Sequence, residues 1–209
     1  INNSNILGSS LQIPYFHVIS DNKDLTFKPT FFDKDILMFQ NEYRQQNKNS
    51  FFITDFNITD GYKSKTTNEK NTLIHLFTEY EADLDFNSFV ESTLNISIQK
   101  VNNDTYLKVF DTNIVDTELK PENSNTLTSD IELKLEHEKF ALNTGFTAYE
   151  DLSKPNGDRY QFILPYYNFS KSFLNDSNFG SFNFISQGDN ILKDTNSLRS
   201  RMINNLNIQ

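Results

Sequence analysis

The chain has 209 residues and a formal net charge of -9. Because nucleic-acid affinity is built mainly on Lys and Arg, this charge balance argues against a nucleic-acid partner. The chain contains no Cys, which excludes disulfides and thiolate metal sites, and no apolar run of about 18 residues, which excludes a transmembrane helix but not a transmembrane β-barrel.

Period-two alternation between turn signals predicts an all-β fold, an antiparallel meander of about eleven strands. The first four strands are expected at residues 11–19, 24–32, 36–45 and 50–59, joined by the short connectors SDNK, DKD and QNKN. A polar segment at 60–71 is expected to form an exposed loop, followed by strands at 72–85 and 86–101. The segment NNDTYLKVFDTNIVDTELKPENSN is too long for a hairpin turn. Strands then resume at 126–136, 140–149, 160–171, 179–187 and 198–208.

Each expected strand has an apolar face and a hydrophilic face. In strand 36–45, for example, Leu37, Phe39 and Tyr43 fall on one face, and Gln40, Glu42 and Arg44 fall on the other. The wet outer faces of a soluble β-sandwich produce the same alternation. However, strands of about 10 to 15 residues exceed the globular mode of about 5 to 6, and they favour a large transmembrane barrel with a lipid-facing exterior and a wet lumen. The candidates for the lumen wall are Gln40, Glu42, Arg44, His75, Glu79, Glu81 and Asp83.

Two neighbouring expected strands each contain a proline, Pro14 and Pro29. Proline has no N–H to give to a sheet ladder, so it is confined to edges, strand starts and bulges. If the first hairpin turns about Asp21 and Asn22, the two prolines lie opposite each other and ladder bonds are lost from both strands. Each lost bond is worth about 0.5 to 1.5 kcal/mol. The pair marks either a weak seam in the sheet or an ordinary edge strand with a strand end or bulge.

Four blocks follow one another along the chain: IPYFHVISDNKDLTFKP, NEYRQ, NNDTYLKVF and RYQFILPYYNFSKSF. In this order and approximate spacing they resemble the barrel domain of the lipopolysaccharide-assembly outer-membrane protein family, the LptD (organic solvent tolerance protein, OstA) family. The first two blocks resemble its opening proline-aromatic-aromatic strand, N-x-D-[LA]-T turn region, second proline and E-Y-R strand. The third resembles its SDxxYLxDF segment, and the fourth its later L-P strand.

The resemblance implies that residues 1–209 are the N-terminal portion of an outer-membrane β-barrel of about 26 strands, with the jelly-roll domain and the remaining strands absent. It implies a non-enzymatic function, the transport of lipopolysaccharide through the lumen and a lateral gate into the outer leaflet of the outer membrane. Pro14 and Pro29 would lie beside that gate. The implied partners are lipopolysaccharide, membrane lipid, an LptE-type lipoprotein plug in the lumen, and a periplasmic lipopolysaccharide-bridge protein that docks on the missing jelly-roll domain.

Metal or lipid-phosphate binding has weaker signals. The carboxyl groups of Glu79, Glu81 and Asp83 suit divalent cations, but without a Gly-bearing calcium loop they are expected to form a solvated wall. Arg44 and the RSR triplet at 199–201 suit lipid phosphates, or ordinary pairing with neighbouring charges.

Catalysis also has little support in the sequence. Neither a G-x-S-x-G element nor a phosphate-binding Gly-rich loop accompanies His17, His75 and His137, so no catalytic site and no cofactor is expected. The alternative function, from another class, is that of a soluble or surface-exposed β-sandwich that serves as a binding or adhesin module.

Overall fold

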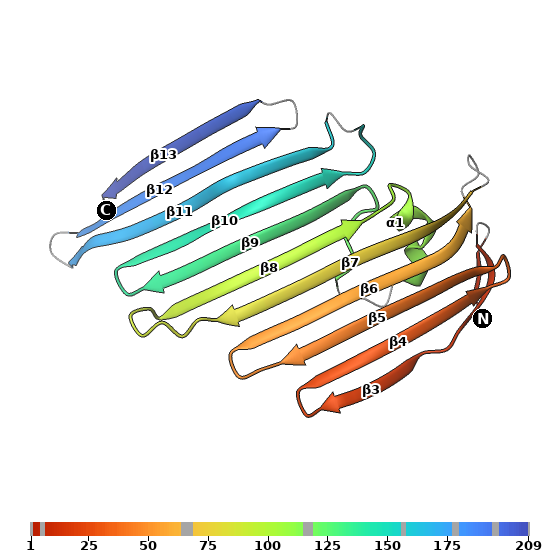
Figure 1. Cartoon of the computed structure of the whole chain (residues 1–209). Helices are drawn as coiled ribbons and strands as arrows, with labels where there is room; N and C mark the ends of the chain where they lie inside the picture. The colour runs from red at the N-terminus through yellow and green to blue at the C-terminus, as the bar shows by residue number, and fades with distance from the viewer. Residues whose placement is uncertain are drawn as a thin grey trace. The chain divides into compact units, whose positions relative to one another are not determined.

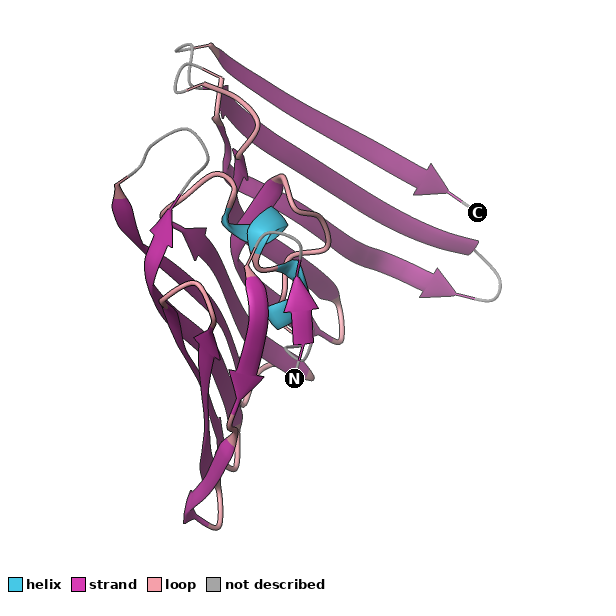
Figure 2. Cartoon of the chain, turned by 90° about the vertical axis from the view of Figure 1, so that its right-hand side faces the viewer, coloured by secondary structure: helices cyan, strands magenta, loops and turns pink. Residues whose placement is uncertain are grey.

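The computed structural model describes residues 2–4, 7–63, 69–114, 119–155, 158–176, 180–193 and 197–208. The protein is all-β, with 74% strand and 3% helix, so strands dominate every part of the chain drawn in Figure 2. Successive strands pair in the order β1-β2-β4-β5-β6-β7-β8-β9-β10-β11-β12-β13, and β3 pairs with β4 (Figure 1). The predicted antiparallel meander is therefore confirmed.

The first part of the chain forms β1 (Asn2–Ser4), β2 (Gly8–Gln12), β3 (Tyr15–Ser20), β4 (Lys23–Phe32), β5 (Ile36–Gln46) and β6 (Ser50–Lys63). Then come β7 (Lys70–Asp83) and β8 (Glu91–Val101). The described residues 102–114 and 119–125, which we name the insert segment, leave the sheet and contain α1 (Tyr106–Val109) and the 3-10 turn η1 (Asp111–Asn113). The remaining strands are β9 (Thr126–His137), β10 (Phe140–Asp151), β11 (Tyr160–Asp176), β12 (Gly180–Lys193) and β13 (Leu198–Ile208).

Several of the expected boundaries differ from the structure, and β11 and β12 run past their expected ends at 171 and 187 to Asp176 and Lys193. The strand expected at 11–19 is two strands, β2 and β3, because Pro14 and its neighbour Ile13 interrupt it. β6 and β7 extend into the loop expected at 60–71, since Gly61, with a φ of 86°, bends β6 without ending it. Residues 86–90 form a turn rather than the start of β8. The expected start of another strand, at residue 179, lies outside the described residues.

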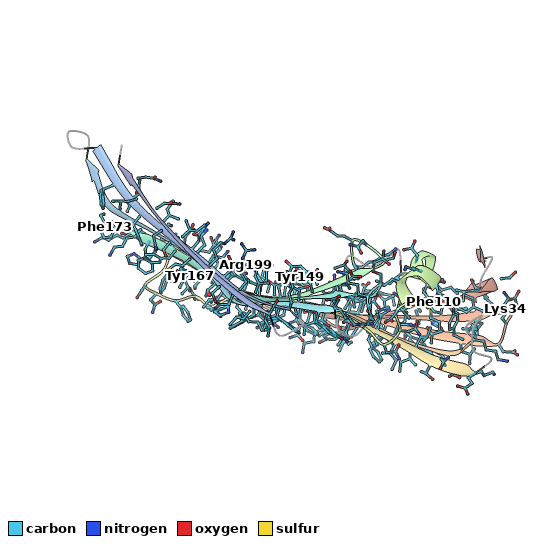
Figure 3. All side chains as sticks on the ribbon, turned by 90° about the horizontal axis from the view of Figure 1, so that it is seen from above. Lys34, Phe110, Tyr149, Tyr167, Phe173 and Arg199 are labelled. Carbon is cyan, nitrogen blue, oxygen red and sulfur yellow. The ribbon has the colours of Figure 1, made fainter. Side chains whose placement is uncertain are left out.

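The chain divides into two compact units. Unit 1 comprises Ile1–Glu79 and Ile98–Leu127, and unit 2 comprises Tyr80–Ser97 and Thr128–Gln209. The insert segment thus belongs to unit 1. Each unit contains one part of β7 and one part of β8, and side chains stand off both faces of the strands (Figure 3).

The register assigns the side chains of unit 1 to two faces, because directly opposed residues of paired strands point to the same side of a sheet. Phe39 lies opposite Pro29 on β4 and Ile58 on β6. We name this side the apolar face of unit 1; it carries Leu11, Ile13, Leu25, Phe27, Pro29, Phe31, Leu37, Phe39 and Ile58. Its reverse, the polar face, carries Thr26, Lys28, Thr30, Gln40, Glu42, Arg44, Asp55, Asn57 and Thr59, and beside them the buried apolar side chains of Phe32, Ile36, Met38 and Ile53.

Unit 2 has two faces of the same kinds. Leu94 and Ile96 of β8 lie opposite Leu133 and Ile131 of β9, and these side chains begin the apolar face of unit 2. Its polar face carries Thr93, Asn95, Glu132, Lys134, Asn143 and Asn168. Asn143 Nδ2 of β10 donates to Glu132 Oε1 of β9 at 2.7 Å. The polar sides of these two neighbouring strands therefore face the same way.

Candidate functional site

The insert segment packs on the polar face of unit 1. Four of its side chains are almost completely buried: Tyr106, Leu107, Phe110 and Ile114. The Phe110 ring lies with its centroid 6.5 Å from that of Phe32 and 5.9 Å from that of Tyr62. An apolar cluster therefore forms on the side of the sheet where the sequence places polar residues, because the insert segment supplies the covering layer.

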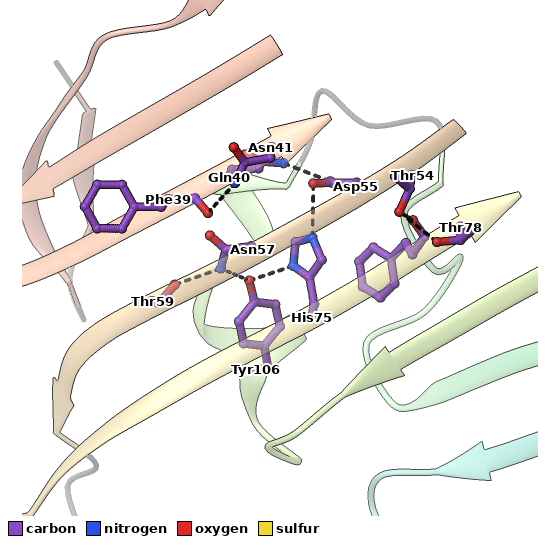
Figure 4. Close-up of polar contacts among 11 residues, drawn as sticks. Phe39, Gln40, Asn41, Thr54, Asp55, Asn57, Thr59, His75, Thr78 and Tyr106 are labelled. Carbon is purple, nitrogen blue, oxygen red and sulfur yellow. Dashed lines mark hydrogen bonds and ion pairs between the residues drawn. The ribbon is translucent and has the colours of Figure 1, made fainter. Parts of the chain in front are cut away.

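A buried polar network joins the insert segment to β5, β6 and β7 (Figure 4). Tyr106 Oη lies 2.7 Å from His75 Nδ1 and receives an N–H from Asn57 Nδ2 at 2.6 Å. His75 Nε2 lies 3.2 Å from Asp55 Oδ1, and Gln40 Nε2 donates to Asp55 Oδ2 at 2.9 Å. All five side chains are at most 2% exposed, so each depends on the others for its hydrogen bonds.

Chemistry fixes one hydrogen-bond direction in this network. The Asn57 NH₂ group only donates, so Tyr106 Oη accepts from it. Which of Tyr106 Oη and His75 Nδ1 donates to the other depends on the tautomer of the ring. His75 Nε2 and Asp55 Oδ1 are at ion-pair distance but form no hydrogen bond. The network therefore links the insert segment to β6 through Asn57 and to β7 through His75.

Burial raises the pKa of the Tyr106 hydroxyl above its ordinary value of 10.0. The hydrogen bond from Asn57 opposes this shift, and the nearby Asp55 carboxyl group adds to it. The hydroxyl is consequently held in its neutral form, the only form that can donate to His75. Leaving a buried donor or acceptor without its partner costs about 1 to 3 kcal/mol, so the network resists separation of the insert segment from the sheet.

The chemistry available to the network is limited by its burial. Tyr106, His75 and Asp55 resemble an acid–base relay in their order, but each is completely buried, and a relay needs a reacting group within hydrogen-bond reach. Within the described ranges, no group of three or more His, Cys, Asp or Glu side chains is placed to hold a metal ion. The arrangement therefore fastens the insert segment to the sheet.

The predicted lumen-wall residues lie on the polar side of β5 and β7 in different surroundings. Gln40 and His75 are brought together at Asp55. Arg44 Nε donates to Asp24 Oδ1 at 3.0 Å and lies 3.7 Å from Glu42, so ordinary charge pairing holds it. Three carboxylates of β7 are exposed and lie outside this network: Glu79, Glu81 and Asp83.

Three members of the network were not singled out from the sequence. Asp55 and Asn57 alternate with Phe56 and Ile58 in β6, a period-two signal that was available in the stretch TDFNITD. Tyr106 had no comparable signal, because it lies in a polar segment 31 residues from His75 and 49 from Asn57.

The apolar face of unit 1 is exposed. Side chains on β2, β4, β5 and β6, and at the residue following β2, are between 36% and 53% exposed: Leu11, Ile13, Phe31, Leu37, Phe39 and Ile58. The rings of Phe27 and Phe39 stack on this side, with centroids 6.1 Å apart. An antiparallel sheet in water ordinarily covers its apolar side and wets its polar side. In unit 1 the apolar face is exposed, whereas the opposite side, on which the insert segment packs, carries both the polar network and buried apolar side chains: Phe32, Ile36, Met38 and Ile53.

The size of this face suits a bilayer. On β4 it runs from Leu25 to Phe31, six residue steps that span roughly 20 Å at about 3.3 Å each. The outward apolar band of an outer-membrane barrel is about 25 Å tall. Contiguous exposed apolar surface of this extent marks an interaction site rather than ordinary surface.

The two prolines lie at the edge of unit 1, one register step away from the predicted pairing. Tyr15 pairs with Phe27 and Gln12 with Thr30, so Ile13, and not Pro14, faces Pro29. The reason is an irregularity between Val18 and Ser20, which shifts the hairpin register.

The hydrogen-bond pattern separates the effects of the two prolines. The Ile13 N–H donates to the Pro29 carbonyl at 3.0 Å, but proline has no N–H for the return bond. Residues facing each other alternate between bonded and non-bonded pairs, so Pro14 belongs to a non-bonded pair with Lys28. Its missing donor is therefore on the free side of the edge, and one bond rather than two is lost between these strands.

The polar face of unit 2 carries paired charges. Lys134 Nζ donates to both carboxyl oxygens of Glu91, at 2.9 and 3.0 Å. Arg201 donates to Asp189 Oδ1 from Nε at 3.0 Å and from Nη2 at 2.8 Å. The RSR triplet at 199–201 thus has an internal carboxyl partner at its third residue, as ordinary charge pairing requires.

No family model and no curated protein matches the chain. Among the described helices, none is long and apolar enough to cross a membrane.

Proposed function

We propose that the chain forms part of the wall of an outer-membrane β-barrel, with the apolar faces of its two units towards lipid and the polar faces towards the lumen. The observation that carries this proposal is the exposed apolar face of unit 1, with a buried polar network on its reverse. Leu37 and Phe39 are exposed on one side of β5, while Gln40 is buried together with Ile36 and Met38 on the other. A lipid-facing exterior and a polar interior partly filled by an inward-folded segment account for both sides.

We further propose that this barrel carries lipopolysaccharide to the outer leaflet, as the resemblance of the four sequence blocks implies. The sugar part of such a lipid needs a wet route, which polar faces provide, and its acyl chains need an opening towards the hydrocarbon. Pro29 removes one bond at the edge formed by β2, β3 and β4, and Pro14 offers no donor to a strand beyond it. An edge of this kind is a suitable lateral gate.

The partners follow from this proposal. Lipopolysaccharide and membrane lipid contact the wall, an LptE-type lipoprotein occupies the lumen, and a bridge protein delivers the lipid through the jelly-roll domain. The reaction is transport, without covalent chemistry or a cofactor.

Delivery of lipopolysaccharide to the cell surface tests the gate. Cells that make the full-length protein with Pro14→Thr and Pro29→Thr together should deliver the glycolipid more slowly, because a tighter seam opens less often. The matched control is Pro155→Thr, at a loop position after β10, which should leave delivery unchanged. Equal delivery by the double variant and the wild type would contradict the gate.

Flotation tests the wall itself and separates it from the adhesin alternative. The full chain should float with phospholipid vesicles after reconstitution and should aggregate without detergent or lipid. A monomer that stays folded in detergent-free buffer would support a binding module, since its apolar faces would then be covered by protein.

A further inference from the structure

We infer that a groove on the polar face of unit 1, beside the edge strand β3, holds one acyl chain of a membrane lipid. This inference rests on the proposed function and adds a binding site for the apolar part of a lipid at the proposed gate. The lining, the size and the charge balance of the groove all point to this occupant.

The edge strand β3 carries large apolar side chains on both of its faces. Among the described strands it pairs with β4 alone (Figure 1). Tyr15 lies opposite Phe27, on the apolar face of unit 1. Phe16 and Val18 lie on the polar face, where Val18 is opposite Asp24, and they are 54% and 59% exposed. The apolar surface of unit 1 therefore continues around the edge strand onto the polar face.

A groove of about 470 Å³ lies on this side of the sheet. Phe16 and Val18 line it from β3, and Phe51 and Ile53 line it from β6. One row of the register crosses the four strands beneath it: Val18, Asp24, Arg44 and Ile53. Sites for small ligands have volumes of about 300 to 1,000 Å³ and are lined mainly by apolar side chains with a few polar groups. The groove is therefore of a size to take one small apolar group rather than a whole lipid.

The lining changes from polar to apolar along the strands. The turn between β3 and β4 lines one end with polar groups, from Ser20 to Lys23. Phe16 lies four residue steps before Ser20, roughly 13 Å away at about 3.3 Å per step. The groove begins beside Leu25 on β4, where the apolar face on the other side of the sheet also begins. Because a lipid has the same order of a polar headgroup followed by an acyl chain, we place the headgroup at the turn and the chain between the apolar walls.

The charges in the groove cancel. Two carboxyl groups and two basic groups line it: Asp21, Asp24, Lys23 and Arg44. Arg44 Nε donates to Asp24 Oδ1 at 3.0 Å, so these two charges compensate each other within the protein. The methylene groups of the Arg44 side chain add apolar surface to the lining. The groove therefore favours an uncharged apolar chain over an anionic group such as a phosphate.

Tryptophan fluorescence detects such a chain, because the protein contains no Trp and bromine atoms on lipid acyl chains quench a Trp that they contact. Phe51→Trp places the reporter in the groove. Phe52→Trp, at the next residue, places it on the apolar face, where the ring of Phe52 lies 6.0 Å from that of Tyr43. The full chain is reconstituted in vesicles of phosphatidylcholine brominated along its acyl chains.

Lys28→Trp controls for lipid that reaches the polar face around the edge of the sheet. Lys28 lies on the polar face of β4 opposite Gln40, outside the lining of the groove. Phe51 lies on β6, three strands from β3, which is roughly 14 Å at about 4.8 Å per strand. Lipid that spreads around the edge therefore meets position 28 before it meets position 51.

Phe51→Trp and Phe52→Trp should both be quenched several-fold more than Lys28→Trp. If Phe52→Trp is quenched and Phe51→Trp is not, no chain enters the groove, and this inference is overturned while the wall holds. If Lys28→Trp is quenched as strongly as Phe51→Trp, lipid covers the whole polar face and the groove is not a distinct site. If Phe52→Trp is not quenched, protein such as a second copy covers the apolar face, and the wall and the groove are both contradicted.

The charge balance supplies a second test in the Phe51→Trp protein. Arg44→Gln leaves the Asp24 carboxylate without its cation, and a bare charge retains water and disfavours an apolar neighbour, so quenching should fall several-fold. Adding Asp24→Asn removes both charges and should restore the quenching. Phe52→Trp in the same two backgrounds should be quenched as before, which shows that the sheet is intact. Unchanged quenching of Phe51→Trp by Arg44→Gln would contradict the neutral groove as the site of the chain.

Discussion

Tyr106 in α1 and His75 in β7 are joined by a hydrogen bond of 2.7 Å, although 31 residues separate them in the chain. The bond connects the insert segment to a strand whose other face carries exposed Leu76. Through this bond the insert segment buries polar side chains of the sheet that would otherwise face solvent.

Replacing Tyr106 by Phe should lower the free energy of unfolding by about 1 to 3 kcal/mol, because Asn57 Nδ2 and His75 Nδ1 lose a shared buried partner. Urea unfolding of the reconstituted chain, followed by far-ultraviolet circular dichroism, measures the change. Tyr15→Phe is the matched control, since Tyr15 is 61% exposed. An equal unfolding midpoint for both variants and the wild type would show that the Tyr106 hydroxyl does not contribute to stability.

The raised pKa of Tyr106 predicts a dependence of stability on alkaline pH. Above pH about 10 the unfolded chain loses the phenol proton, whereas the folded chain retains it. The folded state then binds more protons, so the stability contributed by this group is complete below pH 10 and falls above it by about 1.4 kcal/mol per pH unit.

Tyr106→Phe lacks this contribution, and the other tyrosines are common to both proteins. The stability advantage of the wild type over Tyr106→Phe should therefore shrink as the pH rises above about 10. Urea titrations at a series of pH values from neutral to alkaline measure it. An advantage that stays constant across the series would mean that the pKa is not raised.

His75 stands between the Tyr106 hydroxyl and the Asp55 carboxyl group, so its replacements should differ in cost. His75→Leu leaves the buried Tyr106 hydroxyl without this hydrogen-bond partner and should destabilise by about 1 to 3 kcal/mol. His75→Gln retains a donor and an acceptor and should cost clearly less. Unfolding midpoints of the two variants, compared with His17→Gln on the exposed β3, measure the difference. Equal costs for Leu and Gln would indicate that shape alone matters at this position.

The two prolines should respond differently when replaced one at a time. Pro29→Thr supplies the missing N–H to the Ile13 carbonyl and should stabilise the edge by about 0.5 to 1.5 kcal/mol. Pro14→Thr supplies a donor that points away from β4, so it should leave the stability of the isolated chain unchanged. The Ile13 amide exchanges its hydrogen when its bond to the Pro29 carbonyl breaks, so its exchange rate measures the local stability of the edge. Greater protection from Pro14→Thr than from Pro29→Thr would contradict the register described above.

Alternation was sufficient to predict the strands because it is a local property. β9 carries Leu127, Ile131, Leu133 and Leu135 on one face, and a one-residue slip would turn that whole face to the other side of the sheet. The prolines show the limit of such reasoning. The predicted pairing of Pro14 with Pro29 was one step wrong, since a single irregularity near Val18 and Ser20 has no signature in the residues themselves.

The candidate site was predictable only in part. Gln40 and His75 were recognised as polar positions on the proper face, whereas their burial was not, because burial depends on Tyr106 reaching back across the sheet. A short helix in a polar segment gives no periodic signal. Tertiary packing decides which segment covers a face of the sheet, and the residue pattern of that face does not reveal the covering segment.

The orientation of β5 towards lipid is measured most directly by spin labels, since the chain contains no Cys. Single Cys variants at Leu37, Phe39, Glu42 and Arg44 are labelled with a nitroxide, and the full chain is reconstituted in vesicles. Labels at 37 and 39 should collide frequently with oxygen, which concentrates in lipid, and rarely with a water-soluble nickel chelate; labels at 42 and 44 should show the opposite preference. Frequent collision with nickel at 37 and 39 would show that this face meets water, and would contradict the wall.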